Sequence, residues 1–64
     1  MNYENLLKQF YPKARLIKIG LQFEIFNIDD IYPTSIGDRC STQFEAWKAA
    51  YCQFELKLIQ KLKS

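Results

Sequence analysis

The stretch ARLIKIGLQFEIFNI, residues 14–28, contains the pattern that decides the fold. In its segment LQFEI, apolar and polar residues alternate, and this period of two is typical of a strand with one buried face. Gly20 separates this segment from an equally apolar first half and marks a turn. We therefore predict an antiparallel hairpin with strands at residues 14–19 and 21–28.

Two turns are compatible with this hairpin. A two-residue loop at positions 19–20 sets Leu16 opposite Phe23, and it sets Arg15 opposite Glu24 as a favourable cross-strand charge pair. It also puts a β-branched residue where primed turns require a positive φ. A three-residue loop with a glycine bulge avoids this conflict and shifts the register. We prefer the first, because it groups the apolar residues and matches the charges.

A short helix is predicted before the hairpin, at residues 3–10. Asn2 is a plausible N-cap, and the apolar residues after it recur at helical spacing. The stripe consists of Tyr3, Leu6, Leu7 and Phe10. Tyr11-Pro12 ends the helix, because the residue before a proline avoids the αR region.

A short third strand is predicted after the hairpin. Asn27, Asp29 and Asp30 favour a turn. Residues 31–36 can then form a strand that Pro33 confines to an edge or to irregular pairing. Gly37-Asp38 marks a second turn.

The segment Thr42-Gln43-Phe44-Glu45 is a capping box that opens a long helix. This helix is predicted to run to about Leu62, so its last turns extend past a small sheet. Its main apolar stripe consists of Trp47, Ala50, Tyr51, Phe54, Leu58 and Leu62. We expect Trp47 to be the central core residue, packed against Leu16, Phe23 and Phe10.

These elements give a single α+β domain over residues 1–64, in the order α-β-β-(β)-α. With 48% hydrophobic residues, two Gly and two Pro, the composition is that of a globular domain. A small antiparallel sheet can be covered on one face only. We expect both helices on that face, and the other face open to water or to a partner.

The composition argues against an enzyme. There is no His, which removes imidazole-based triads and zinc sites, and the two Cys cannot form a four-thiolate metal site. No phosphate-binding glycine loop or nucleophile elbow is present. We predict no cofactor and no metal. The N-terminus shows no signal peptide and no apolar run is long enough to cross a membrane, so we expect a cytoplasmic protein with reduced thiols.

The first candidate site is the outer face of the sheet. In the preferred register Ile17, Phe26 and Ile28 point away from the helices, and apolar residues on a solvent face suggest a contact surface. The alternatives are that loops or the termini cover these residues, or that the register is wrong by one residue. The predicted partner-binding residues are Arg15, Phe26, Ile28, Asp29 and Asp30.

The second candidate site is the back of the long helix. Cys52, Leu56 and Ile59 fall 120–180° from Trp47 at about 100° per residue. A helix that is apolar on two sides is either packed on both sides against its own chain or paired with another chain. We therefore predict a homodimer seam at these three residues. The alternative is that the first helix packs onto Ile59 and Cys52 and leaves Leu56 exposed.

The charge distribution favours a protein partner over nucleic acid. The net charge is +2, with basic ends flanking an acidic middle. A nucleic-acid-binding domain of this size usually has a larger positive excess. Nucleic-acid binding is therefore the second hypothesis, and its candidate residues are Lys8, Lys13, Arg15 and Lys18.

The segment from Tyr11 to Cys52 resembles small phage and prophage proteins. The resemblance rests on a helix opening of the form Thr-x-x-Glu-Ala-Trp-x-x-Ala, here residues 42–50, preceded by a strand that ends in residues 35–38. Similar openings occur in HicB-type antitoxins and in domains that resemble the double-stranded-RNA-binding fold. Those RNA binders use a lysine cluster at the start of the second helix, where this chain has Lys48 beside Glu45. The resemblance implies a phage-type protein that binds a host protein or complex, such as an anti-CRISPR inhibitor, in the host cytoplasm.

Overall fold

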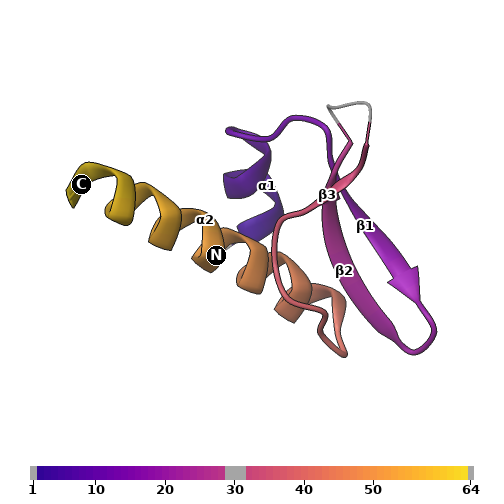
Figure 1. Cartoon of the computed structure of the whole chain (residues 1–64). Helices are drawn as coiled ribbons and strands as arrows, with labels where there is room; N and C mark the ends of the chain where they lie inside the picture. The colour runs from indigo at the N-terminus through magenta and orange to yellow at the C-terminus, as the bar shows by residue number, and fades with distance from the viewer. Residues whose placement is uncertain (1, 29–31, 64) are drawn as a thin grey trace.

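A hairpin of two six-residue strands makes up most of the sheet in the structure, a computed structural model that describes residues 2–28 and 32–63. The sheet lies on one side of the molecule and both helices lie on the other (Figure 1). The order of elements is α1 (Tyr3–Lys8), β1 (Ala14–Ile19), β2 (Gln22–Asn27), β3 (Thr34–Ser35) and α2 (Gln43–Lys63). The predicted α+β class is confirmed.

The turn of the hairpin differs from the predicted one. β1 pairs with β2 so that Ile19 faces Gln22, which makes the loop Gly20-Leu21. Gly20 has φ +64°, and no non-glycine residue of the described chain has a positive φ. Glycine at the first loop position is the requirement of a type II′ turn, and it keeps position 19 in the strand.

The register therefore shifts by two residues, and the predicted partners change. Leu16 lies opposite Ile25 instead of Phe23, and Arg15 lies opposite Phe26 instead of Glu24. Because side chains alternate between faces with a period of two, an even shift leaves every residue on its predicted face. The predicted outer face is therefore preserved, although the predicted ion pair across the hairpin is wrong.

The third strand is shorter than predicted. β3 pairs antiparallel with β2 in a sheet of order β1-β2-β3, with Phe26 opposite Ser35. The chain then returns to the same edge of β2 at Cys40, which exchanges two backbone hydrogen bonds of 2.7 and 2.8 Å with Phe23. Pro33 directly precedes β3 and has no N–H to donate, which limits how early the pairing can begin.

Both helices begin at the predicted caps. The Asn2 side chain accepts a hydrogen bond from the Asn5 N–H at 3.1 Å, and the Thr42 hydroxyl accepts one from the Glu45 N–H at 3.1 Å. α1 ends at Lys8, two residues before the predicted end.

Trp47 lies in the core as predicted, with 8% of its surface exposed. Leu16 and Phe23 pack against that core. Phe10 does not belong to it, because it lies beyond the last turn of α1, where it is 54% exposed and stacks on Phe54 at 4.6 Å between ring centroids. The buried residues are Leu7, Ala14, Ile25, Ile36, Ala46, Trp47 and Ala50.

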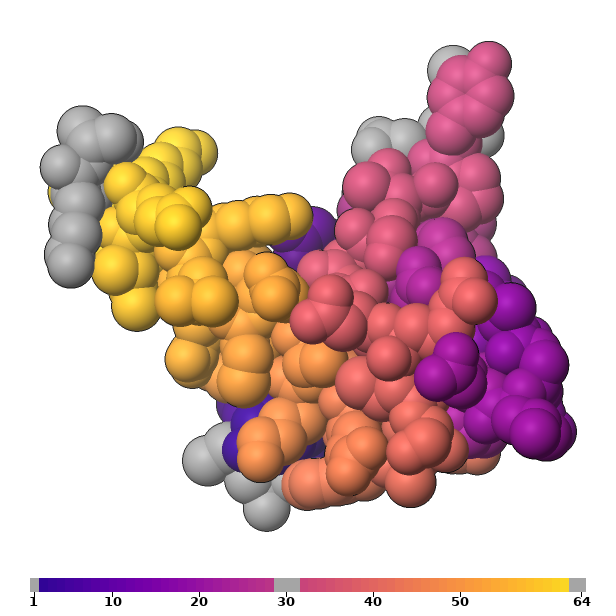
Figure 2. Space-filling view, turned by 60° about the horizontal axis from the view of Figure 1, so that its bottom comes forward, coloured from indigo at the N-terminus to yellow at the C-terminus, as the bar shows by residue number. Residues whose placement is uncertain are grey.

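α1 covers only the first part of α2. The Tyr3 ring lies 5.6 Å from Phe44 and 5.7 Å from Tyr51, and the Tyr11 ring lies 5.6 Å from Phe54. These aromatic contacts end at Phe54, so the last turns of α2 extend past the rest of the molecule, as the helix length predicted (Figures 1 and 2).

Candidate functional site

The outer face of the sheet carries apolar side chains that are partly accessible. Alternation along β1 and β2 places Arg15, Ile17, Glu24 and Phe26 on the face turned away from the helices. Arg15 is exposed, whereas Ile17 and Phe26 are half-buried. Ile28, just beyond β2, is 37% exposed. Three of the five predicted partner-binding residues therefore lie near one another around β2. The other two, Asp29 and Asp30, lie outside the described residues.

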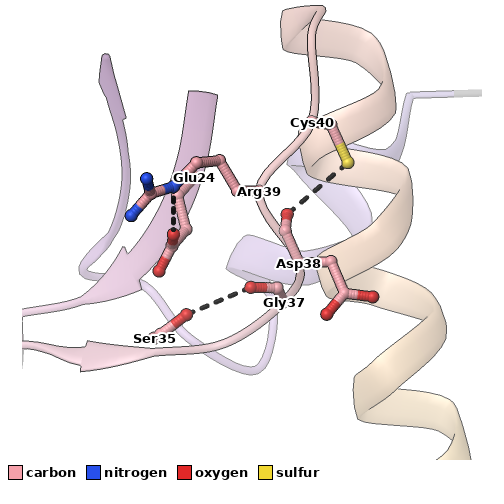
Figure 3. A network of polar contacts seen from close by, with 6 residues as sticks. All are labelled: Glu24, Ser35, Gly37, Asp38, Arg39 and Cys40. Atoms are coloured by element: carbon pink, nitrogen blue, oxygen red, sulfur yellow. Dashed lines mark hydrogen bonds and ion pairs between the residues drawn. The ribbon is translucent and has the colours of Figure 1, made fainter. Parts of the chain in front are cut away.

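A polar network borders this face at the edge where the chain runs from β3 towards α2 (Figure 3). Arg39 donates from Nε to Glu24 Oε1 at 3.2 Å, and the Ser35 hydroxyl donates to Gly37 O at 3.0 Å. The pKa of Glu24 lies below its ordinary value, because hydrogen bonding from the Ser35 side chain, together with hydrogen bonding and positive charge from Arg39, outweighs the opposing effect of burial.

Sequence reasoning missed the partner of Glu24. Arg39 is fifteen positions away, and it reaches Glu24 because the Phe23–Cys40 bridge holds the preceding loop beside β2. The shifted register explains why Arg15 does not fill this role. Charge complementarity alone does not distinguish Arg15 from Arg39, and the turn geometry does.

The back of α2 is exposed along its second half. Cys52, Leu56 and Ile59 all lie on the surface, because α1 and the residues after it pack along the opposite side of α2, with Tyr3 against Tyr51 and Tyr11 against Phe54. The three predicted seam residues thus share an accessible helix face.

The exposed apolar surface of α2 is larger than the predicted seam. Leu58 and Leu62, which the sequence placed on the core stripe, lie beyond the reach of α1 and the sheet. The exposed fractions are 52% for Leu56, 46% for Leu58, 47% for Ile59 and 79% for Leu62. We refer to these four residues as the α2 ridge. Each is C-terminal to Phe54, where the aromatic contacts with the N-terminal segment, residues 3–11, end.

The two cysteines lie in different environments. The Cys40 thiol is partly buried and donates to Asp38 O at 3.5 Å, and burial, assisted by the carboxylates of Glu45 and Asp38, raises its pKa. A raised pKa lowers the thiolate fraction and makes Cys40 a weak nucleophile at neutral pH. Cys52 is exposed on α2.

The four basic residues proposed for nucleic-acid binding do not share one surface. Lys8 donates to Glu4 Oε2 at 2.7 Å and its Nζ lies 5.4 Å from the Trp47 ring centroid. Arg15 and Lys18 are both exposed, but their positions in β1 place them on opposite faces of the sheet. A continuous basic groove over these residues is therefore not formed.

Within residues 2–28 and 32–63, no group of three or more acidic or cysteine side chains is arranged to hold a metal ion. In the same part of the chain, no helix combines the length and the apolar character needed to span a membrane. No protein-family model matches the sequence, and no curated protein or solved structure shows significant similarity to it.

Proposed function

We propose that this protein is a small non-enzymatic module that binds another protein. In its most concrete form it is an inhibitor from a phage or mobile element that engages a host complex in the host cytoplasm, as anti-CRISPR proteins do. The observation that supports a binding role most directly is the α2 ridge, because four large aliphatic side chains in seven positions of one helix are exposed to water.

The physical argument concerns what these side chains do for the isolated chain. Burying an aliphatic side chain contributes about 1.5–3 kcal/mol, and a domain of this size has few such contributions to spare. The α2 ridge leaves this stabilisation unused within the chain. Contiguous exposed apolar residues commonly mark interaction sites in soluble proteins.

The outer sheet face adds a second contact region. Phe26 and Arg15 belong to the residue types that contribute most to protein interfaces. They lie directly opposite each other in the hairpin, so one partner surface can contact both. Asp29 and Asp30 follow in sequence and complete the proposed partner-binding set.

Self-association is part of this proposal. Cys52, Leu56 and Ile59 have spacings of four and three residues, which is the repeat of a helix–helix seam. Two copies that meet through this face form a closed symmetric pair, because the same patch is buried on both chains. The outer sheet face would remain available for the partner.

The test is capture of a defined partner by tagged protein, with variants that alter surface and not fold. Phe26→Ala should weaken capture by more than tenfold, which corresponds to about 1.4 kcal/mol, while the melting temperature changes little. Leu21→Ala is the matched control, because Leu21 lies in the hairpin turn and is 89% exposed.

Two results would contradict the proposal. The first is that Phe26→Ala, Leu21→Ala and a variant of the α2 ridge, Leu62→Ala, all capture the partner equally well. The second is salt-sensitive retention of duplex RNA or DNA, which is the signature of phosphate contacts and would favour a nucleic-acid-binding module using the basic residues around β1.

A further inference from the structure

We propose that the free edge of β1 binds an extended acidic segment of the partner by antiparallel strand addition. This inference rests on the proposed protein-binding function and specifies how part of the partner is recognised. The segment places acidic residues opposite Arg15 and Lys18 and apolar residues opposite Leu16 and Ile17.

The sheet topology leaves one side of β1 open. The order is β1-β2-β3, so β1 has β2 on one side, and no strand of the described chain pairs with its other side. Figures 1 and 2 show β1, in purple, at the margin of the molecule, on the side away from α2. An edge of this kind presents unpaired N–H and C=O groups that can accept a further strand.

The hydrogen bonds identify which backbone groups point outwards. Ile28 N–H donates to Lys13 O at 3.3 Å, which marks a bonded pair between the two sides of the hairpin. Bonded and non-bonded pairs alternate along an antiparallel ladder. Positions 15, 17 and 19 are therefore bonded to β2, and Leu16 and Lys18 direct their N–H and C=O groups away from it.

The opposite edge of β2 supports this assignment. Ile25 O accepts from the Ile36 N–H at 2.9 Å, and Phe23 exchanges hydrogen bonds with Cys40. The odd-numbered residues of β2 thus bond towards β3, and the even-numbered ones bond towards β1. At the start of β1, the Ala14 N–H donates to Tyr11 O at 3.0 Å, so the open edge begins at Leu16.

Charge specifies the occupant of this edge. Arg15 and Lys18 are exposed, and neither forms an ion pair with a residue that the structure describes. Glu24, the carboxylate nearest in the hairpin, is paired with Arg39. A second copy of β1 would bring two sets of cations along one seam, whereas acidic residues of another chain would neutralise them. An acidic partner is therefore favoured over self-pairing.

The apolar positions complete the recognition pattern. Leu16 and Ile17 are half-buried and lie on opposite faces of the sheet, between the two cations. A strand that reads acidic, apolar, apolar, acidic thus finds a matching neighbour at each of four consecutive positions. Because this pattern is the same in both chain directions, an antiparallel and a parallel segment would need the same order of acidic and apolar residues.

The test uses the labelled hexapeptide Thr-Glu-Val-Val-Glu-Thr and its lysine counterpart, Thr-Lys-Val-Val-Lys-Thr, with binding followed by fluorescence anisotropy. The acidic peptide should bind at least tenfold more tightly. The variant with Arg15→Glu and Lys18→Glu should reverse this preference. Equal binding of both peptides by the native protein, or no binding of the acidic peptide, would overturn the inference.

Backbone pairing is separated from charge attraction by N-methylation of a single valine. In the antiparallel arrangement the second valine lies opposite Leu16 and directs its N–H to β1, so its methylation should abolish binding. The first valine directs its N–H outwards, so its methylation is the matched control and should preserve binding. Equal binding of the two methylated peptides would show charge attraction without strand addition.

The protein side of the ladder has an equivalent pair of variants. Lys18→Pro removes an outward N–H and no bond to β2, whereas Lys18→Ala removes the charge alone.

Adding the acidic peptide should slow amide exchange at Leu16 and Lys18 and leave Ile17 unchanged. Amide exchange at Leu16 and Lys18 that is slow without peptide, and that becomes slower as the protein concentration rises, would instead indicate self-pairing. Capture of a partner that Lys18→Pro leaves unchanged would overturn this inference and leave the protein-binding function intact.

Discussion

Gly37 lies directly against the backbone of Ala50 in α2. A Cβ atom at position 37 would stand 2.6 Å from both Cα and N of Ala50, and 3.0 Å from the carbonyl carbon of Ala49. Ala50 is fully buried. The loop between β3 and α2 therefore contacts the helix backbone to backbone, and this contact sets the separation of α2 from the sheet.

Gly37→Ala should lower the free energy of unfolding by about 1–3 kcal/mol, the usual cost of overpacking, because neither backbone can move away without disturbing the core. Urea denaturation followed by circular dichroism measures the change. Gly20→Ala is the comparison: no atom lies within 4 Å of the added Cβ, so its cost of about 1–3 kcal/mol comes from backbone strain at φ +64° and not from a contact with α2. An unchanged urea midpoint for Gly37→Ala would show that the loop does not press on the helix.

Trp47→Ala should cost about 3–5 kcal/mol, because it removes a large buried ring. This loss is most or all of the free energy of unfolding expected of a 64-residue domain. The variant should therefore be largely unfolded by circular dichroism at 25 °C. Phe44→Ala is the matched control, since Phe44 lies one turn away on α2 and is mostly exposed. Near-native melting of Trp47→Ala would contradict the central role of this residue in the core.

The contribution of Glu24 to stability should depend on pH. Its pKa in the folded chain lies below the ordinary value of 4.5, so the charged form is favoured by folding. The resulting stabilisation is fully present above the unfolded pKa and is lost as the pH falls through the lower folded pKa. The urea midpoints of the native protein and of Glu24→Gln should therefore differ at pH 7 and converge in strong acid.

Arg39→Ala provides the control for this titration. Loss of the guanidinium removes a hydrogen bond and a positive charge, so the pKa of Glu24 should rise in an NMR titration of its carboxyl carbon. A Glu24 pKa that is unchanged in Arg39→Ala would show that the ion pair at 3.2 Å does not persist in solution.

Leu56→Glu tests the proposed homodimer. If Cys52, Leu56 and Ile59 form the seam, the native protein should sediment as a dimer at tens of micromolar, and the variant should sediment as a folded monomer. An unpaired charge inside an interface is costly, whereas the same charge on an isolated helix surface is not. Leu21→Glu, in the exposed hairpin turn, should leave the dimer intact. A native protein that sediments as a monomer under these conditions would remove the seam.

The parts of the fold that depend on neighbouring residues were predicted correctly. Asn2 and Thr42 begin their helices, because each cap needs only an N–H three positions away. The faces of the hairpin were also right, since they follow from alternation along each strand. The length of α2 predicted that its last turns would extend beyond the sheet.

Features that depend on distant residues were missed. The turn forms at Gly20-Leu21, and the resulting two-residue shift replaces the expected Arg15–Glu24 pair by Arg39–Glu24. The sequence marked Gly37 only as a turn residue, because nothing local reveals that Ala50 lies against it. Phe10 was assigned to the core because helical spacing does not show that α1 ends at Lys8.

The position of the α2 ridge separates the residues that stabilise the fold from residues that are free to vary, two roles that usually overlap within a small domain. Residues such as Trp47 and Ala50 hold the fold together and tolerate little change, whereas Leu58 and Leu62 lie beyond the contacts that stabilise it. Mutations on the ridge can therefore accumulate at little cost in folding free energy. If the α2 ridge contacts a partner as proposed, substitutions at this helix end can change the specificity of binding while the core residues stay constant.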